Sequence, residues 1–228
     1  MQNSIKRGNW LWDICFTLLV LEEPGHYWPK LLTDTRNRMC LIDGDVVEKK
    51  NIVRQGYQQQ DVGDNKAVAL SRKINSLYDT NCIFMDQYIN DENLINLIKS
   101  YKAYIPVILG CVDNDKTRKI IEKVINDKDL KYCYYIDSAN SEYEGNVYTV
   151  SKKQGVITGK LRSQIYKLDE DKHPDEVSCQ DQAANGNIQY LVTNAKMAVA
   201  VLEHCHALLK SGYKEGVQVV KRFETVFY

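Results

Sequence analysis

Acidic, basic and amide side chains recur at positions where they can handle a nucleoside triphosphate. A carboxylate after a strand accepts ribose hydroxyl groups, and arginine or lysine neutralises phosphate charge. A further carboxylate suits Mg²⁺, which prefers hard oxygen donors and bridges phosphates. The residues of this kind are, in chain order, Asp43, Asp45, Asn51, Arg54, Gln55, Lys66, Asp113, Asn114 and Arg118. Together they predict a nucleotide site, although each alone also fits a plainer role as a turn cap, a helix cap or a surface charge.

Short apolar runs place these residues at strand ends. Residues 38–43 and 105–112 are apolar, and each ends in or leads into an acid, which is typical of a buried parallel strand followed by a loop. Ligands bind at the carboxyl ends of such strands. Further elements are predicted as strands at 82–85 and 132–136 and helices at 64–78, 92–101 and 117–125. This alternation predicts an α/β fold with a doubly wound, Rossmann-like, mostly parallel sheet.

The two ends of the chain show different patterns. An unbroken apolar stretch predicts a core helix over 10–22, with Asn9 as its cap and Pro24 beyond its end. The C-terminal elements expected are a hairpin at 146–157, a helix at 188–209 and a last strand at 217–227. They predict antiparallel strands after the parallel part. Residues 160–186 are polar and irregular, so we expect a mobile loop there. The whole chain, 1–228, is expected to form one domain.

Composition narrows the function classes. Thirty basic and thirty acidic residues cancel, which gives no overall charge footprint for nucleic acid. The most apolar stretch, 10–21, is shorter than the roughly twenty residues that cross a bilayer, so no membrane association is expected. The seven cysteines include no C-x-x-C pair, which argues against a disulfide scaffold and favours the cytoplasm. His204 and His206 are two residues apart on a helix, which is poor geometry for a shared metal.

Three stretches resemble the ThiF/MoeB/ubiquitin-activating superfamily. Residues 41–55 read Leu-Ile-Asp-Gly-Asp-Val-Val-Glu-Lys-Lys-Asn-Ile-Val-Arg-Gln. Residues 62–67 give Val-Gly-x-x-Lys-Ala, and residues 112–118 give Val-Asp-Asn-x-x-x-Arg. The family pattern is roughly D-x-D-x-V-x-x-x-N-x-x-R-Q, then V-G-x-x-K, then D-N-x-x-x-R, in the same order and spacing. The resemblance covers about residues 8–228 and is nearest to small, single-domain bacterial ThiF-like proteins.

This resemblance implies an ATP-dependent adenylyltransferase. The C-terminal carboxylate of a small ubiquitin-like or sulfur-carrier protein ending in Gly-Gly attacks the α-phosphate of ATP, which yields an acyl-adenylate and pyrophosphate. By resemblance Asp43 holds the ribose, Asp45 belongs to the same cofactor-binding set, and Asp113 binds Mg²⁺. The residues implied to contact phosphates are Asn51, Arg54 and Lys66, and those implied to shape the pocket are Gln55, Asn114 and Arg118. The implied catalytic residues are Arg54, Lys66 and Asp113.

The resemblance also bears on the nucleophile, the oligomeric state and the presence of zinc. Some members use a loop cysteine to take the acyl group or sulfur, and Cys179 stands in the polar loop; an inert loop thiol is the alternative. Relatives are commonly dimers, so a homodimer is expected by resemblance. Relatives often carry two C-x-x-C pairs for zinc, which this sequence lacks, so no structural zinc is expected.

The chain departs from the family at its start. The family opens with a strand and a G-x-G-G-x-G loop whose amides approach the phosphates. Here Gly8 matches only the end of that loop, and the strand is expected to be missing. Two explanations stay open: a shortened chain, or a scaffold or heterodimer partner that binds nucleotide weakly or not at all. A nicotinamide-dependent Rossmann dehydrogenase and a domain for another nucleotide are rival readings, although Arg54 and Lys66 have no role with NAD.

Overall fold

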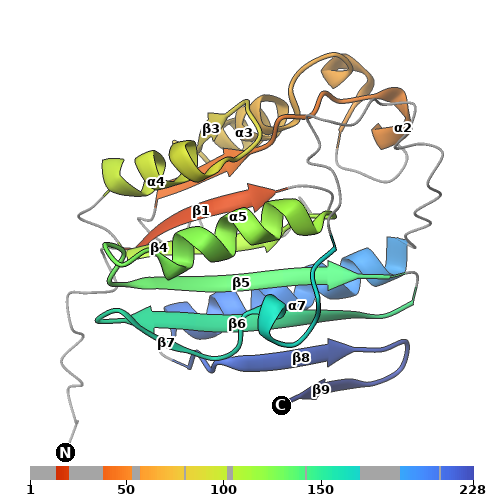
Figure 1. Cartoon of the computed structure of the whole chain (residues 1–228). Helices are drawn as coiled ribbons and strands as arrows, with labels where there is room; N and C mark the ends of the chain where they lie inside the picture. The colour runs from red at the N-terminus through yellow and green to blue at the C-terminus, as the bar shows by residue number, and fades with distance from the viewer. Residues whose placement is uncertain are drawn as a thin grey trace, which may run out of the picture.

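A computed structural model gives the fold of the chain (Figure 1). The residues that it describes are 14–20, 38–52, 57–79, 81–101, 105–141, 143–169, 191–210 and 212–228, with backbone alone for 14–20, 38 and 191. They form one nine-stranded sheet with helices on both of its faces. The strand order along the main path is β3-β2-β1-β4-β5-β6-β8-β9, and β7 pairs with β6 beside it.

One half of the sheet is parallel. Its strands are β1 (Ile14–Val20), β2 (Arg38–Ile42), β3 (Ile83–Met85), β4 (Ile105–Cys111) and β5 (Cys133–Asn140). Strand β1 lies at the centre of this half, paired with β2 on one side and β4 on the other. The chain therefore builds outwards from β1 in one direction to β3 and then in the other direction to β5. This reversal of strand order is the topological switch point of the sheet.

The prediction of a core helix over 10–22 was wrong, because residues 14–20 form the strand β1. A short, unbroken apolar run cannot be assigned to helix or strand by periodicity alone, since a strand buried on both faces gives the same pattern. The expectation that the first strand is missing was therefore also wrong. Gly8 was predicted to belong to the phosphate loop, but in this family that loop follows the first strand, whereas Gly8 precedes β1 in the sequence. The observed position of β1 therefore no longer supports that prediction, and Gly8 itself lies outside the described residues.

The other half of the sheet is antiparallel. Its strands are β6 (Gly145–Lys153), β7 (Val156–Thr158), β8 (Gly216–Val220) and β9 (Thr225–Phe227). The predicted last strand at 217–227 is instead a hairpin, because Lys221 N donates to Glu224 O at 2.7 Å and closes a turn between β8 and β9. Among the described strands, parallel and antiparallel pairings are equally numerous. The sheet is thus mixed, and "mostly parallel" was too strong.

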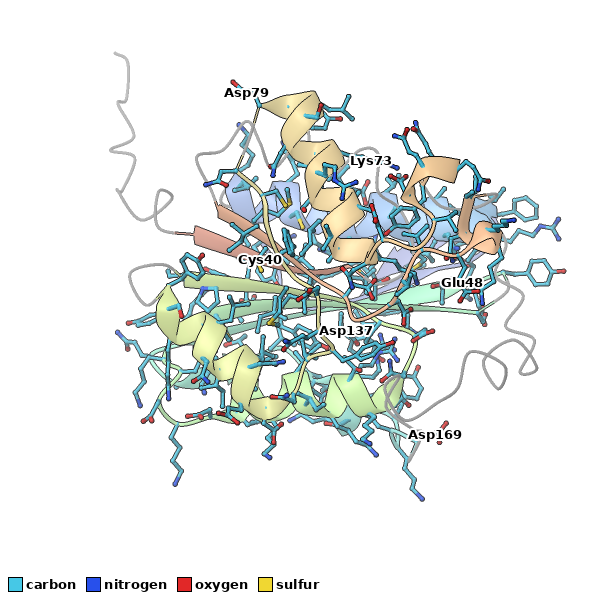
Figure 2. The ribbon with its side chains drawn as sticks, turned by 90° about the horizontal axis from the view of Figure 1, so that it is seen from above. Cys40, Glu48, Lys73, Asp79, Asp137 and Asp169 are labelled. Carbon is cyan, nitrogen blue, oxygen red and sulfur yellow. The ribbon has the colours of Figure 1, made fainter. Side chains whose placement is uncertain are left out.

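Helices cover both faces of the sheet, as Figure 2 shows from above. The helical elements are α2 (Lys49–Ile52), α3 (Lys66–Tyr78), α4 (Asp91–Ser100), α5 (Asp115–Asn126) and α7 (Leu191–Leu209), with short 3-10 turns η2 (Gln59–Asp61) and η3 (Arg162–Gln164). Helices α3 and α7 lie on one side, and α4 and α5 on the other. In the described residues no helix is long and apolar enough to cross a membrane.

Alternation along the strands builds two separate cores. Leu41 and Leu109 face α3 and α7, whereas their neighbours Ile42 and Ile108 face α4 and α5. Each of these side chains is at most 1% exposed. Strands buried on both faces read as continuous apolar runs, which is why β2 and β4 were recognisable in the sequence. The two cores hold the strand ends rigidly, and those ends carry the predicted site.

Candidate functional site

The predicted site residues lie at the carboxyl ends of β2 and β4. These two strands flank β1, so their ends are separated by two strand spacings, or about 10 Å. Because strand order reverses at β1, this edge of the sheet is where doubly wound folds bind ligands. Figure 2 shows Glu48, which follows β2, and Asp169, which contacts the start of α5, at the same end of the molecule.

A first group of side chains, here named the Asp–Lys cluster, consists of Asp43, Asp45, Asn65, Lys66 and Tyr88. Asp43 is 2% exposed, and its Oδ1 accepts the backbone N–H of Asp45 at 2.7 Å. The Asn65 amide donates to the carbonyl oxygens of Asp43 and Asp45, at 2.7 and 3.0 Å. The same Asn65 caps α3 by accepting the Val68 N–H at 3.1 Å. The turn after β2 is therefore fastened to the start of α3.

Lys66 and Asp45 form the ion pair of this cluster. Lys66 Nζ lies 2.8 Å from Asp45 Oδ2, and the two side chains are 5% and 28% exposed. The Tyr88 hydroxyl donates to the other carboxylate oxygen, Oδ1. Burial raises the pKa of Asp45, but the Lys66 charge and the hydrogen bonds from Lys66 and Tyr88 outweigh burial, so this pKa lies below its ordinary value. Asp45 is thus a carboxylate shared by a cation and a neutral donor.

Three neighbours of the Asp–Lys cluster were missed by sequence reasoning. The Tyr57 hydroxyl donates to the carbonyl of Lys66 at 3.4 Å. Burial, followed by the charges of Asp43, Asp61 and Asp45, raises the pKa of Tyr57, so the phenol stays neutral. Lys73 pairs with Asp61 and lies over the Tyr57 ring. The feature of the sequence that could have pointed to Tyr57 is its position, two residues after the predicted Arg54-Gln55 pair.

Asn51 lies in α2 and is 2% exposed. Its Oδ1 accepts the Glu48 N–H at 2.7 Å, and its own N–H donates to Glu48 O at 2.9 Å. In this arrangement Asn51 fastens the turn after β2, and its use for phosphates remains a prediction. Arg54 and Gln55 lie outside the described residues.

The end of β4 presents an exposed carboxylate at the start of α5. Asn114 is the N-cap of α5, and its Oδ1 accepts the Thr117 N–H at 2.8 Å. Its amide group also donates to Asp113 Oδ1 at 3.2 Å, which orients that carboxylate. Asp113 is exposed, whereas Asn114 is buried. A single exposed carboxylate suits Mg²⁺, which usually takes one or two carboxylates and completes its shell with water and substrate phosphates. The positive end of the α5 dipole favours the phosphates rather than the metal ion.

A second group, here named the arginine cluster, consists of Arg118, Asp137 and Arg162, together with Asp115. Arg118 Nε lies 3.3 Å from Asp137 Oδ1, and Nη1 lies 2.9 Å from Asp115 Oδ1. Its Nη2 donates to the carbonyls of Val112 and Ser138. Every nitrogen of this buried guanidinium therefore meets a protein acceptor. Arg118 connects β4, α5 and β5. If it shapes the predicted nucleotide pocket, it does so by holding these three elements in place.

Arg162 completes the arginine cluster from η3, and no pattern in the sequence predicted its role. Its Nε donates to Asp137 Oδ2 at 2.5 Å, its Nη1 donates to Asn146 Oδ1 at 2.6 Å, and its guanidinium lies 4.4 Å from the Tyr148 ring centroid. Asp137 is 0% exposed and lies between the sheet and α5 (Figure 2). Among the described buried side chains, Arg162 Nη2 and the Tyr135 hydroxyl have no hydrogen-bond partner.

Of the cysteines whose side chains the structure describes, Cys111 is half-buried and the others are buried, namely Cys40, Cys82, Cys133 and Cys205. Cys82 and Cys133 are buried, and burial raises the pKa of each thiol to about 12. Cys179, the candidate nucleophile, lies outside the described residues. In the described part of the chain no three His, Cys, Asp or Glu side chains gather as a metal site would require.

The strand order and the mixed sheet define a Rossmann-like α/β protein. The chain belongs to the ThiF family, whose sequence model matches residues 37–224. This family typically comprises adenylyltransferases and generally binds ATP. The resemblance predicted from the motifs is thereby confirmed at the level of the family.

Solved structures share the fold. The selenomethionine crystal structure of PaaA is 17% identical with a TM-score of 0.63, and the match covers 96% of this chain and 64% of PaaA. E. coli MccB, solved with AMPCPP and selenomethionine MccA, is 15% identical with a TM-score of 0.63, and the match covers 96% of this chain and 63% of the MccB chain. A second structure of E. coli MccB matches at 16% identity and a TM-score of 0.65, and the match covers 96% of this chain and 62% of the MccB chain.

These likenesses concern the fold, because all identities are below one fifth. The chain spans less than two thirds of the length of each of these proteins. No curated protein matches the chain in sequence.

Proposed function

We propose that the chain is an ATP-dependent adenylyltransferase that activates the C-terminal carboxylate of a small ubiquitin-like or sulfur-carrier protein. One observation carries this proposal. The Asp45–Lys66 pair follows β2, and Asp113 stands across β1 from it at the start of α5. A cation and a metal-ligating carboxylate on the two sides of a switch point suit a bound triphosphate.

The proposed reaction joins a carboxylate to the nucleotide. A carboxylate oxygen of the partner forms a bond to the α-phosphorus, the bond from that phosphorus to the pyrophosphate oxygen breaks, and pyrophosphate leaves with the electron pair. Lys66, with Arg54 and Asn51, would offset the charge that develops on the phosphate oxygens. Asp43 would hold the ribose. Asp113 would hold Mg²⁺, whose chemistry is to neutralise phosphate charge and orient the leaving group.

The partner and assembly follow from the resemblance. The proposed substrate protein ends in Gly-Gly, and the structure of MccB with AMPCPP and MccA supports the idea that this fold takes a second polypeptide beside a nucleotide. We further propose that the parallel, doubly wound half of a single domain binds the nucleotide. A homodimer working in the cytoplasm completes this proposal, and Cys179 remains a candidate acceptor of the acyl group.

ATP–pyrophosphate exchange tests the reaction. The wild-type chain is supplied with Mg²⁺ and a panel of small proteins ending in Gly-Gly, and is compared with Asp113→Ala. Loss of a group that stabilises transition-state charge costs on the order of a hundredfold in rate. The matched control is Asp129→Ala, because Asp129 is also exposed but lies beyond the opposite end of α5. Exchange that survives in Asp113→Ala would contradict its assigned role.

A second candidate function is a scaffold or heterodimer partner with impaired catalysis. It is favoured by the burial of Asp43 and Lys66, at 2% and 4% exposed, and by the Asp45 carboxylate that already neutralises Lys66. Calorimetry separates the two candidates. A wild-type chain that shows neither exchange nor ATP binding would favour the scaffold and contradict the adenylyltransferase.

A further inference from the structure

Tyr88 lies directly over the acidic turn that follows β2. It comes from the loop between β3 and α4, where its carbonyl accepts the Asn93 amide at 2.9 Å. A Cβ atom on Gly44 would lie 2.5 to 2.7 Å from the Cγ and Cδ atoms of the Tyr88 ring. The ring therefore packs on the bare backbone of Gly44, between the two aspartates.

The hydroxyl of Tyr88 reaches the carboxylate that neutralises Lys66. It donates to Asp45 Oδ1, while Lys66 Nζ lies 2.8 Å from Asp45 Oδ2. The three groups form a chain in which the middle member, Asp45, is held from both sides. The low pKa of Asp45 agrees with this double support.

We propose that Tyr88 is a positioning residue that acts through Asp45 to release Lys66 for the phosphates of the nucleotide. This proposal rests on the proposed function. For Lys66 to turn to a phosphate it must leave Asp45, and Asp45 then remains a largely buried carboxylate. A buried carboxylate that lacks a partner is costly. The hydrogen bond from Tyr88 lowers that cost, because a neutral donor stays with Asp45 when the cation departs.

The variant Tyr88→Phe removes the hydroxyl and keeps the ring over Gly44. We expect calorimetry to show ATP binding weakened about tenfold, since hydrogen bonds to charged groups have this order of effect. Adenosine has no phosphate for Lys66, so its affinity is expected to stay unchanged. The matched control is Tyr132→Phe, an exposed tyrosine in the loop before β5. Equal weakening of ATP and adenosine would overturn the proposal, because Tyr88 would then contact the nucleoside or shape the fold.

A double-mutant cycle tests whether the effect passes through Asp45. In the background of Asp45→Asn, Lys66 no longer has to leave a carboxylate, so adding Tyr88→Phe is expected to change ATP affinity no further. A tenfold loss that persists in this background would overturn the proposal.

Failure of the proposed function gives a different result. A wild-type chain that binds no ATP contradicts that function, and the positioning role is then judged by amine modification of Lys66, followed by peptide mass spectrometry. Release of Lys66 by Tyr88 predicts faster modification in the wild type than in Tyr88→Phe. Equal rates would overturn the positioning role.

Discussion

The Asp–Lys cluster and the arginine cluster both pair acids with bases near the carboxyl edge of the sheet, but they are built for different purposes. In the Asp–Lys cluster a lysine meets a carboxylate that is 28% exposed and has a neutral second donor. In the arginine cluster Asp137 is 0% exposed and sits between two guanidinium groups. Lysine is a flexible point charge, whereas arginine is a planar fork that fixes several acceptors at once. We therefore expect the first cluster to exchange partners and the second to keep them.

Removing the central acid of the arginine cluster should have the largest effect on stability. Asp137→Asn leaves Arg118 and Arg162 buried without their shared counter-ion. Breaking such a buried pair costs about 3–5 kcal/mol of unfolding free energy. Urea denaturation followed by circular dichroism measures this loss. Asp113→Asn, at an exposed carboxylate, is the control and should change stability by less than about 0.5 kcal/mol. Equal losses of unfolding free energy in the two variants would contradict the structural role assigned to Asp137.

The glycine under Tyr88 gives the next largest effect. Gly44→Ala would place a methyl group within 2.7 Å of ring carbons, so the ring or the turn must shift. Overpacking of this kind typically costs about 1–3 kcal/mol. The matched control is Gly212→Ala, because a Cβ there meets its nearest neighbour at 3.7 Å. A smaller loss for Gly44→Ala in a Tyr88→Ala background would locate the clash at the ring; an unchanged loss would contradict it.

The sequence predicted the Asp–Lys cluster better than the arginine cluster, and the reason is motif rather than sequence distance, since Asp45 and Lys66 are themselves 21 residues apart. Asp43, Asp45 and Lys66 fall in spacings that follow a strand and start a helix, and the structure brings the Asp45 carboxylate to the Lys66 amine. Arg162 meets Asp137 across 25 residues from a stretch with no periodic pattern. No local rule links two such positions, because only the packing of η3 on β5 and β6 creates their contact.

The parallel strands show a similar division. Strands β2 and β4 were recognisable because acids and turn residues bound their apolar runs on the carboxyl side. Residues 14–20 give an apolar run of equal strength, and there the pattern was assigned to a helix. Central strands of parallel sheets read as apolar runs without alternation, so the assignment of residues 14–20 depends on their pairing with β2 and β4.

The smallest expected effect is the response of the Asp45–Lys66 pair to acid. The pKa of Asp45 is lowered on folding, so its carboxylate stabilises the fold above its unfolded pKa of about 4 and loses that contribution as pH falls through the lower folded value. The gap in unfolding free energy between the wild type and Asp45→Asn should be constant above about pH 5 and narrow below about pH 4.

A partly exposed ion pair contributes under about 1 kcal/mol to stability, so the expected change in this gap is modest. Urea midpoints at several pH values measure it. A gap that widens on acidification would mean that folding raises the pKa of Asp45, and this would contradict the stabilisation of its charge by Lys66 and Tyr88.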